Sequence, residues 1–224
     1  MVDRFAKYEG PIALRFKKEI RMDANRMAQY LQRLTNITGL SMSQNVKPLV
    51  DDHPSFLFTN QKFSLSTLTN LQEWYDMPCF GKDHFEMLLN FSRLTKLRLQ
   101  AENWHKATLE QIIINNSNLE VLDLDYNMNA NDLISILPNP SRLTSLSIPP
   151  SSFNFKEEDY SKLGNLRHLR MHRGFYRTFT ALESLEADYC AVSFDFNTTL
   201  TRLILTSSSD KILKTSLPNL VNLH

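Results

Sequence analysis

The chain has 224 residues, of which 25 are Lys or Arg, 24 are Asp or Glu, and 42% are hydrophobic. This length allows one or two domains with a substantial core, and a net charge of +1 gives no reason to expect nucleic acid or an acidic membrane as partner. Two cysteines are too few for a disulfide framework, and the five glycines lie too far apart for a phosphate-binding loop.

One nine-residue pattern, L-x-x-L-x-L-x-x-N with other apolar residues accepted at the leucine positions, recurs along the chain. A degenerate copy, PIALRFKKE, begins at Pro11, with Leu14 and Phe16 as its apolar pair. Clearer copies begin at Ile37, Leu71, Leu94, Leu119, Leu143, Leu166, Leu182 and Leu200, and the pattern starts again at Leu220. Most of these starting positions are separated by distances in or near a 20–29-residue period.

The apolar residues of each copy alternate with variable ones, which predicts a short strand. One such strand cannot bury its apolar face alone, but copies stacked side by side close a continuous core. The sequence therefore predicts an α/β solenoid with a parallel sheet on its concave side.

Several segments between the predicted strands have helical spacing of apolar residues. They are Met27–Leu34, Phe85–Leu89, Leu109–Ile113 and Leu133–Leu137, the last with Leu133, Ile136 and Leu137 as its apolar face and Asn131 or Asp132 as its N-cap. We expect these helices on the convex side. After Leu166 the copies shorten, which leaves room only for loops or 3₁₀ turns on that side.

The ninth position of the pattern is predicted to hold a polar or small side chain that contacts neighbouring turns. Asn45 and Asn127 fit a buried hydrogen-bonding ladder there, and Cys79 and Cys190 occupy the same position. Both cysteines are therefore interpreted as small buried residues of the repeat, without a redox or metal role.

Three places depart from the pattern. The long interval between Ile37 and Leu71 is either an insertion or a repeat that the pattern does not detect. Asp76 falls where an apolar residue should point inward, so we expect a distorted register that turns it outward. The pattern also stops partway through a copy at His224, which suggests a further domain or a subunit that covers the C-terminal end.

These repeats resemble the leucine-rich repeat family in its irregular intracellular form. The early copies are similar to the ribonuclease-inhibitor and F-box-associated type, and the shorter late ones are closer in length to the bacterial-effector type. We predict one leucine-rich repeat domain over residues 1–224, with a degenerate repeat or cap over 1–36 and repeats over 37–224. The resemblance implies a non-enzymatic protein that binds other macromolecules.

The variable residues between the leucines are predicted to face the concave side. The candidate partner-binding residues are Glu73, Tyr75, Lys96, Arg98, Asp123, Asp125, His168, Arg170, His172, Glu186, Asp188 and Arg202. Because adjacent repeats stack closely, Lys96 and Arg98 should neighbour Asp123 and Asp125, and the basic strip from His168 to His172 should neighbour Glu186 and Asp188. Such charges either satisfy one another on an exposed face or form a mosaic surface that sets the register of a partner.

Sequence motifs for chemistry are absent. There is no H-E-x-x-H, no C-x-x-C pair and no G-x-S-x-G, and His168 and His172 lie about 13 Å apart on a strand, too far to share a metal. We therefore predict no enzyme activity, no cofactor and no metal site. Trp74 and Trp104 lie near strand ends and are expected to pack under loops; an exposed rim position, where a tryptophan could anchor a partner, is the alternative.

Three functions remain open at this point. The first is a protein-interaction module whose partner is another protein, and the second is a targeting domain of a larger enzyme or of a ubiquitin-ligase substrate receptor. No F-box motif, L-P-x-E-[IL], precedes Leu40, which weakens the ubiquitin-ligase version. Broken basic strips disfavour the third, nucleic-acid binding. No apolar run is long enough for a secretory signal or a membrane span, so we expect a cytoplasmic protein without a membrane partner.

Overall fold

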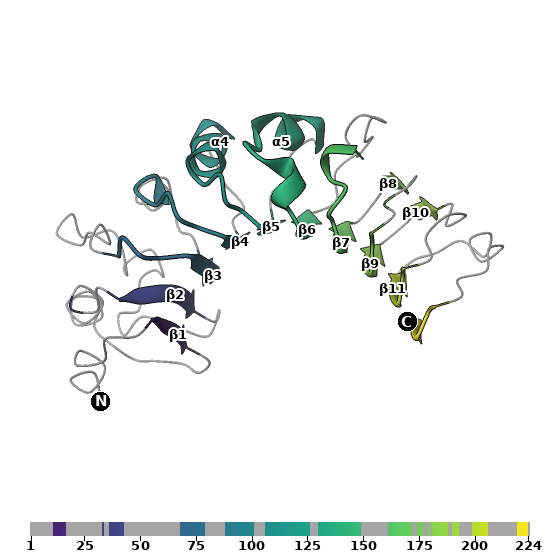
Figure 1. Ribbon diagram of the computed structural model, residues 1–224, viewed down its shortest axis with the longest axis horizontal. Helices are drawn as coiled ribbons and strands as arrows, with labels where there is room; N and C mark the ends of the chain where they lie inside the picture. The colour runs from purple at the N-terminus through teal and green to yellow at the C-terminus, as the bar shows by residue number, and fades with distance from the viewer. Residues whose placement is uncertain are drawn as a thin grey trace, which may run out of the picture. The chain divides into compact units, whose positions relative to one another are not determined.

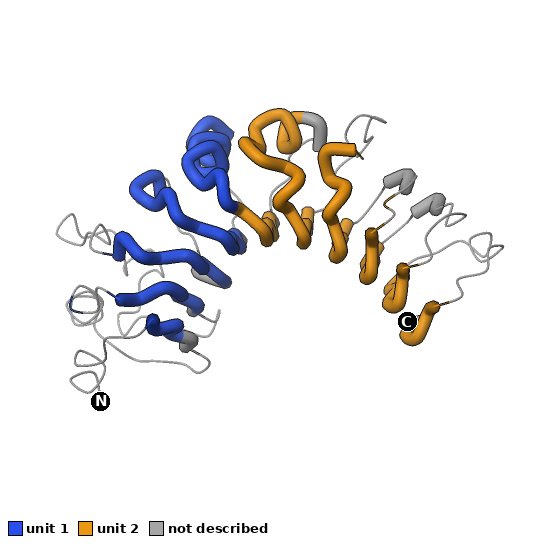
Figure 2. The backbone as a smooth tube through the Cα atoms, viewed as in Figure 1, with its two compact units in different colours: residues 1–118 blue, residues 119–224 orange. Residues whose placement is uncertain are grey.

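A computed structural model describes the chain in segments that follow the repeats. The described residues are 11–16, 33, 36–42, 68–78, 88–100, 106–125, 130–148, 161–171, 174–176, 179, 181–187, 190–192, 199–205 and 219–223. Figure 1 labels the helices and strands. The chain divides into two compact units, residues 1–118 and 119–224 (Figure 2).

Unit 1 is a parallel sheet of consecutive strands. Its elements are β1 (Ile12–Phe16), β2 (Ile37–Met42), β3 (Glu73–Pro78), β4 (Lys96–Gln100) and the helix α4 (Lys106–Asn115). The strands are hydrogen-bonded in chain order. In β1, Leu14 pairs with Leu40 of β2, so Ile12–Phe16 of the motif PIALRFKKE forms a strand of the same sheet.

Unit 2 repeats the same arrangement with shorter strands. Its sheet contains β5 (Val121–Asp125), β6 (Ser145–Ile148), β7 (His168–Met171), β9 (Ser184–Ala187), β11 (Arg202–Leu205) and β12 (Asn222–Leu223). These strands are parallel neighbours in that order. Each unit is therefore built as a leucine-rich repeat solenoid, as the sequence predicts.

The repeated apolar positions form the core. In the repeat that begins at Leu119, residues Leu119, Leu122 and Leu124 are buried, and Val121 and Asp123 between them are half-buried. The same alternation runs through β6, β7 and β9. Each buried leucine contributes roughly 1.5–3 kcal/mol of hydrophobic free energy, and its stacked neighbours in the adjacent strands provide the apolar surroundings.

Helices cover one side of the repeats. In α4 the predicted residues Leu109, Ile112 and Ile113 are buried. The helix α5 (Ala130–Ile136) forms the connection between β5 and β6 and is followed by the 3₁₀ turn η2 (Pro140–Arg142).

Two details of α5 differ from the prediction. The helix begins at Ala130, so Asn131 and Asp132 lie in its first turn and neither precedes it as an N-cap. Ile134 is buried in place of Ile136, which is half-buried. An apolar helix face through Leu133 and Leu137 can include either Ile134 or Ile136. The side on which the helix packs decides between these two residues.

A short second sheet accompanies the late repeats. The strands β8 (Gly174–Tyr176) and β10 (Cys190–Val192) pair in parallel and lie on the side of unit 2 that also carries α5 (Figure 1). The sequence analysis did not anticipate these strands. A three-residue extended segment fits a connection that is too short for a helix and still provides backbone hydrogen bonds to the next repeat.

The irregular repeat at β3 follows the predicted distortion. Trp74 pairs with Leu97, but the next pairing joins Met77 to Leu99, so the strand contains an extra residue at this point. Such a bulge takes Asp76 out of the position opposite Leu99. The strands β2 and β3 are direct neighbours, so the long interval before Leu71 is an insertion that adds no strand between them.

Candidate functional site

The open face of unit 2 is formed by the side chains that alternate with its buried leucines. We define the first row on this face as Ser145, His168, Ser184, Arg202 and Asn222, which the half-buried Val121 extends onto β5, and the second row as Asp123, Ser147, Arg170, Glu186 and Ile204. Members of a row pair directly across adjacent strands, which lie about 4.8 Å apart in a sheet. Each row therefore crosses the strands as a continuous line of side chains.

Opposite charges neutralise part of the second row. The Nε atom of Arg170 lies 3.2 Å from Oε1 of Glu186. This ion pair agrees with the prediction that the basic strip starting at His168 neighbours Glu186. Both side chains are about half exposed, with 48% and 36% of their surface accessible. An ion pair this exposed contributes about 0–1 kcal/mol, so it has little structural value and mainly sets the local charge pattern.

Another pair with the same chemistry lies at the start of the same two strands. The Nη1 atom of Arg167 is 3.3 Å from Oε1 of Glu183, with 61% and 43% of the two side chains exposed. Arg167 and Glu183 precede β7 and β9, outside the two rows of the open face. This pair therefore provides a matched comparison for Arg170 and Glu186.

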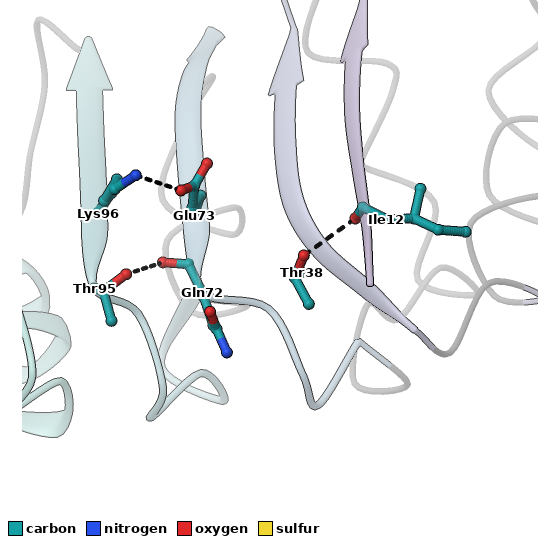
Figure 3. Close-up of polar contacts among 6 residues, drawn as sticks. All are labelled: Ile12, Thr38, Gln72, Glu73, Thr95 and Lys96. Carbon is teal, nitrogen blue, oxygen red and sulfur yellow. Dashed lines mark hydrogen bonds and ion pairs between the residues drawn. The ribbon is translucent and has the colours of Figure 1, made fainter. Parts of the chain in front are cut away.

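Unit 1 presents its own variable face. Glu73 of β3 and Lys96 of β4 form an ion pair of 2.5 Å between Oε1 and Nζ, and both are partly exposed (Figure 3). A side chain at Gly39 would bring its Cβ to 3.1 Å from Ala13 Cβ and 3.4 Å from Glu73 Oε2. Glycine at this position therefore allows Glu73 to lie against β2 without displacing β1.

Threonine hydroxyls link the starts of the strands. Thr95 Oγ1 donates to the carbonyl of Gln72 at 3.3 Å, and Thr38 Oγ1 donates to the carbonyl of Ile12 at 3.4 Å (Figure 3). The same hydroxyl contact joins Thr144 to Glu120 and Thr201 to Glu183, each at 3.1 Å. The sequence analysis missed this ladder, although the signal is visible as threonine after the first apolar residue in ITGL, LTKL, LTSL and LTRL.

A fully buried asparagine connects α4 to the preceding repeat. Asn116 accepts a hydrogen bond from the backbone N–H of Leu94 at 2.8 Å through Oδ1. Its Nδ2 donates to the carbonyls of Phe91 at 2.9 Å and Ile112 at 2.8 Å. The side chain thus closes the helix end against the turn before β4. Sequence reasoning missed Asn116 because it lies outside the nine-residue pattern.

Trp74 is part of the core. It is 1% exposed, occupies the position of Leu40 and Leu97 in the neighbouring strands, and its ring centroid lies 6.0 Å from that of Phe91. This burial excludes Trp74 as an exposed anchor for a partner. Its indole Nε1 has no hydrogen-bond partner among the residues that the structure describes, which leaves a buried donor unsatisfied there.

We expect Trp74→Phe to change the free energy of unfolding by less than about 1 kcal/mol, because loss of the unsatisfied N–H offsets the smaller apolar surface. Trp74→Ala should cost about 3–5 kcal/mol, because it leaves a cavity beside Phe91. Urea unfolding followed by circular dichroism measures both. Equal destabilisation by the two substitutions would show that the indole nitrogen has a partner of its own.

No protein-family model and no curated protein matches the chain. Among solved structures, internalin C2 of Listeria monocytogenes is similar, with 14% identity and a TM-score of 0.38. The alignment covers 93% of this chain and 77% of that chain.

Some predicted site residues lie where the structure gives no side-chain account. The side chains of Asp125 and Cys190 are outside the description, although their backbones lie in β5 and β10. Also outside the described residues or side chains are Asn45, Asp76, Cys79, Trp104, Asn127, His172 and Asp188. Tyr75, Arg98 and Asp123 are half-buried on their strands. The asparagine and cysteine ladder, and the proximity of Lys96 and Arg98 to Asp123 and Asp125, stay predictions.

Neither a metal-binding cluster nor a membrane-spanning helix lies in the part of the chain that the structure describes. Within it, no group of three or more His, Cys, Asp or Glu side chains is placed to hold a metal ion. None of the helices that the structure describes is both long enough and apolar enough to cross a bilayer.

Proposed function

We propose that the chain is a non-catalytic module that recognises another protein through the open face of its parallel sheet. The observation that carries this proposal is that alternate side chains of the same strand serve different purposes. One set of alternate side chains completes the core, and the other set places charged and polar groups on a single accessible face. An exposed sheet face of this kind suits contact with a macromolecule better than enclosure of a small substrate.

Charge on this face supports a role in recognition more than in stability. The pair between Arg170 and Glu186 contributes at most about 1 kcal/mol to folding. An alternating charge pattern instead favours one orientation of a partner and disfavours others, because like charges brought together cost several kcal/mol. The candidate residues His168, Arg170, Glu186 and Arg202 all lie within the two rows of unit 2.

The proposal is tested by quantitative affinity capture from the cytosolic fraction of the native cell, which corresponds to the proposed intracellular location. Arg170→Glu should reduce recovery of a specific partner about tenfold or more, because it places a negative charge where the partner meets a positive one. The matched control is Arg167→Glu, which changes the net charge equally and breaks an equivalent ion pair at the strand start. It should leave recovery within about twofold.

A charge swap separates loss of contact from loss of folding. The double variant Arg170→Glu/Glu186→Arg can re-form the ion pair with reversed polarity, so its thermal unfolding should match the unsubstituted chain. It should still fail to recover the partner. Equal recovery by all variants, or equal loss with Arg167→Glu, would show that this face is not the binding surface.

The same experiment addresses the alternative role as a targeting domain of a larger enzyme or of a ubiquitin-ligase substrate receptor. In that case, subunits of the enzyme would be recovered equally with the unsubstituted chain and with Arg170→Glu, because they would attach outside the open face. Only the recognised target would be lost. Recovery of such subunits would refine the proposed binding function without replacing it.

A further inference from the structure

Polar side chains of the first row of unit 2 lack partners within the part of the chain that the structure describes. His168 and Arg202 are both exposed, and neither side chain has an ion pair or hydrogen bond to any residue of the chain that the structure describes. The hydroxyls of Ser145 and Ser184 and the amide of Asn222, which complete the row, likewise have no such partner within the described segments. The row is therefore a line of available hydrogen-bond donors.

The charged residues of the second row, by contrast, already have partners within the chain. There Arg170 is already engaged by Glu186, and Asp123 also has a contact of its own. Paired groups exchange one partner for another on binding, so an added anion gains less there than at a group without an internal partner. Groups of the first row have no internal partner to give up, so a ligand anion would gain most there.

The side chains of His168 and Arg202 have a defined spacing. His168 pairs with Ser184, and Ser184 pairs with Arg202, so His168 and Arg202 are two strands apart. At about 4.8 Å per strand, their backbones lie about 10 Å from each other. A polyproline-type extended segment advances about 3.1 Å per residue with three residues per turn, so its residues i and i+3 project on one side at about 9.3 Å.

We infer that the first row of unit 2 binds an extended acidic segment of the partner protein, with carboxylates at positions i and i+3. Arg202 binds one carboxylate through its planar guanidinium, and His168 binds the other. Ser184 lies between them and can donate its hydroxyl to a backbone carbonyl of the segment. This inference rests on the proposed function, which it makes specific by naming the chemistry of the ligand.

Charge on the neighbouring row favours carboxylates over a polyanion. Asp123 and Glu186 lie beside the first row, so a continuous chain of phosphates would meet negative groups as well as positive ones. Two separate carboxylates can reach His168 and Arg202 without approaching those acidic residues. Nucleic acid is therefore the competing ligand class that the experiment has to exclude.

The test uses the full chain and a fluorescein-labelled twelve-residue peptide with Glu at positions i and i+3 in a proline-containing background. Fluorescence anisotropy at low salt should detect binding, and an otherwise identical peptide with both Glu residues replaced by Gln should bind at least tenfold more weakly. Arg202→Gln and His168→Gln should each weaken binding of the acidic peptide at least fivefold. The matched control is Arg167→Gln, which removes an exposed cation immediately before β7. Its affinity for the acidic peptide should stay within twofold of that of the unsubstituted chain.

Several outcomes would overturn the inference. They are equal binding of the Glu and Gln peptides, equal weakening by Arg167→Gln, or tighter binding of a single-stranded oligonucleotide of equal charge. Failure here is distinguishable from failure of the proposed function. If the captured partner depends on Arg170 while the acidic peptide does not bind, the module function stands and the acidic ligand is wrong. If the partner depends on neither row, the function itself fails.

Discussion

Replacing Asn116 by alanine is expected to lower the free energy of unfolding by about 2–4 kcal/mol. The substitution removes the acceptor for the buried Leu94 N–H and the donor for the carbonyls of Phe91 and Ile112. These backbone groups are enclosed between α4 and the preceding turn, where water cannot easily replace the amide. Unsatisfied buried groups cost about 1–3 kcal/mol each, and relaxation of the turn reduces the sum.

The matched control for this prediction is Asn118→Ala, two residues further along. Asn118 is exposed and has no hydrogen bond to any residue in the described segments, so its loss should change stability by less than about 0.5 kcal/mol. Urea unfolding followed by circular dichroism measures both variants. Equal stabilities for Asn116→Ala and Asn118→Ala would mean that Asn116 does not hold the helix end.

The second large effect is expected at Leu169 in the centre of β7. Its side chain is 2% exposed and stacks between Leu146 and Leu185 of the adjacent strands. Leu169→Ala should cost about 2–5 kcal/mol, because it leaves a cavity that both neighbouring repeats line. Residues this central in a stacked array support contacts on two sides, so the loss affects more than one repeat.

The neighbouring residue provides the control for Leu169. His168→Ala changes the exposed side of the same strand and should alter stability by less than about 0.5 kcal/mol. The pair of measurements therefore tests the alternation of buried and exposed positions directly. If His168→Ala were as destabilising as Leu169→Ala, β7 would not present His168 on an open face.

Periodicity allowed the strands and their register to be predicted. The spacing of Leu119, Leu122 and Leu124 defines which side chains turn inward, and this local rule holds in both units. It was strong enough to identify the weak copy at Leu14 and to indicate a distorted register at Asp76. Because the pattern acts through neighbouring residues of one strand, no long-range information is needed.

Contacts between distant residues were harder to predict. The bonds of Asn116 and the choice of Ile134 over Ile136 depend on how a helix meets the sheet, and several orientations satisfy the same sequence. The pairing of β8 with β10 depends on segments too short to show a periodic pattern. Of the candidate site, the contact of Arg170 with Glu186 followed from stacking order alone. That His168 and Arg202 have no partner among the described residues depends on the placement of distant side chains, which the pattern does not predict.

The central claim is that a partner covers the open face of unit 2 and leaves the helical side accessible. The most direct measurement is the thiol-labelling rate of Ser147→Cys and of Ser135→Cys, with and without the captured partner, after subtraction of labelling at the native Cys79 and Cys190. Ser147 lies in the second row, and Ser135 is exposed on α5. The account predicts that the partner slows labelling at position 147 at least tenfold and leaves position 135 unchanged. Protection at position 135 with free labelling at position 147 would contradict it.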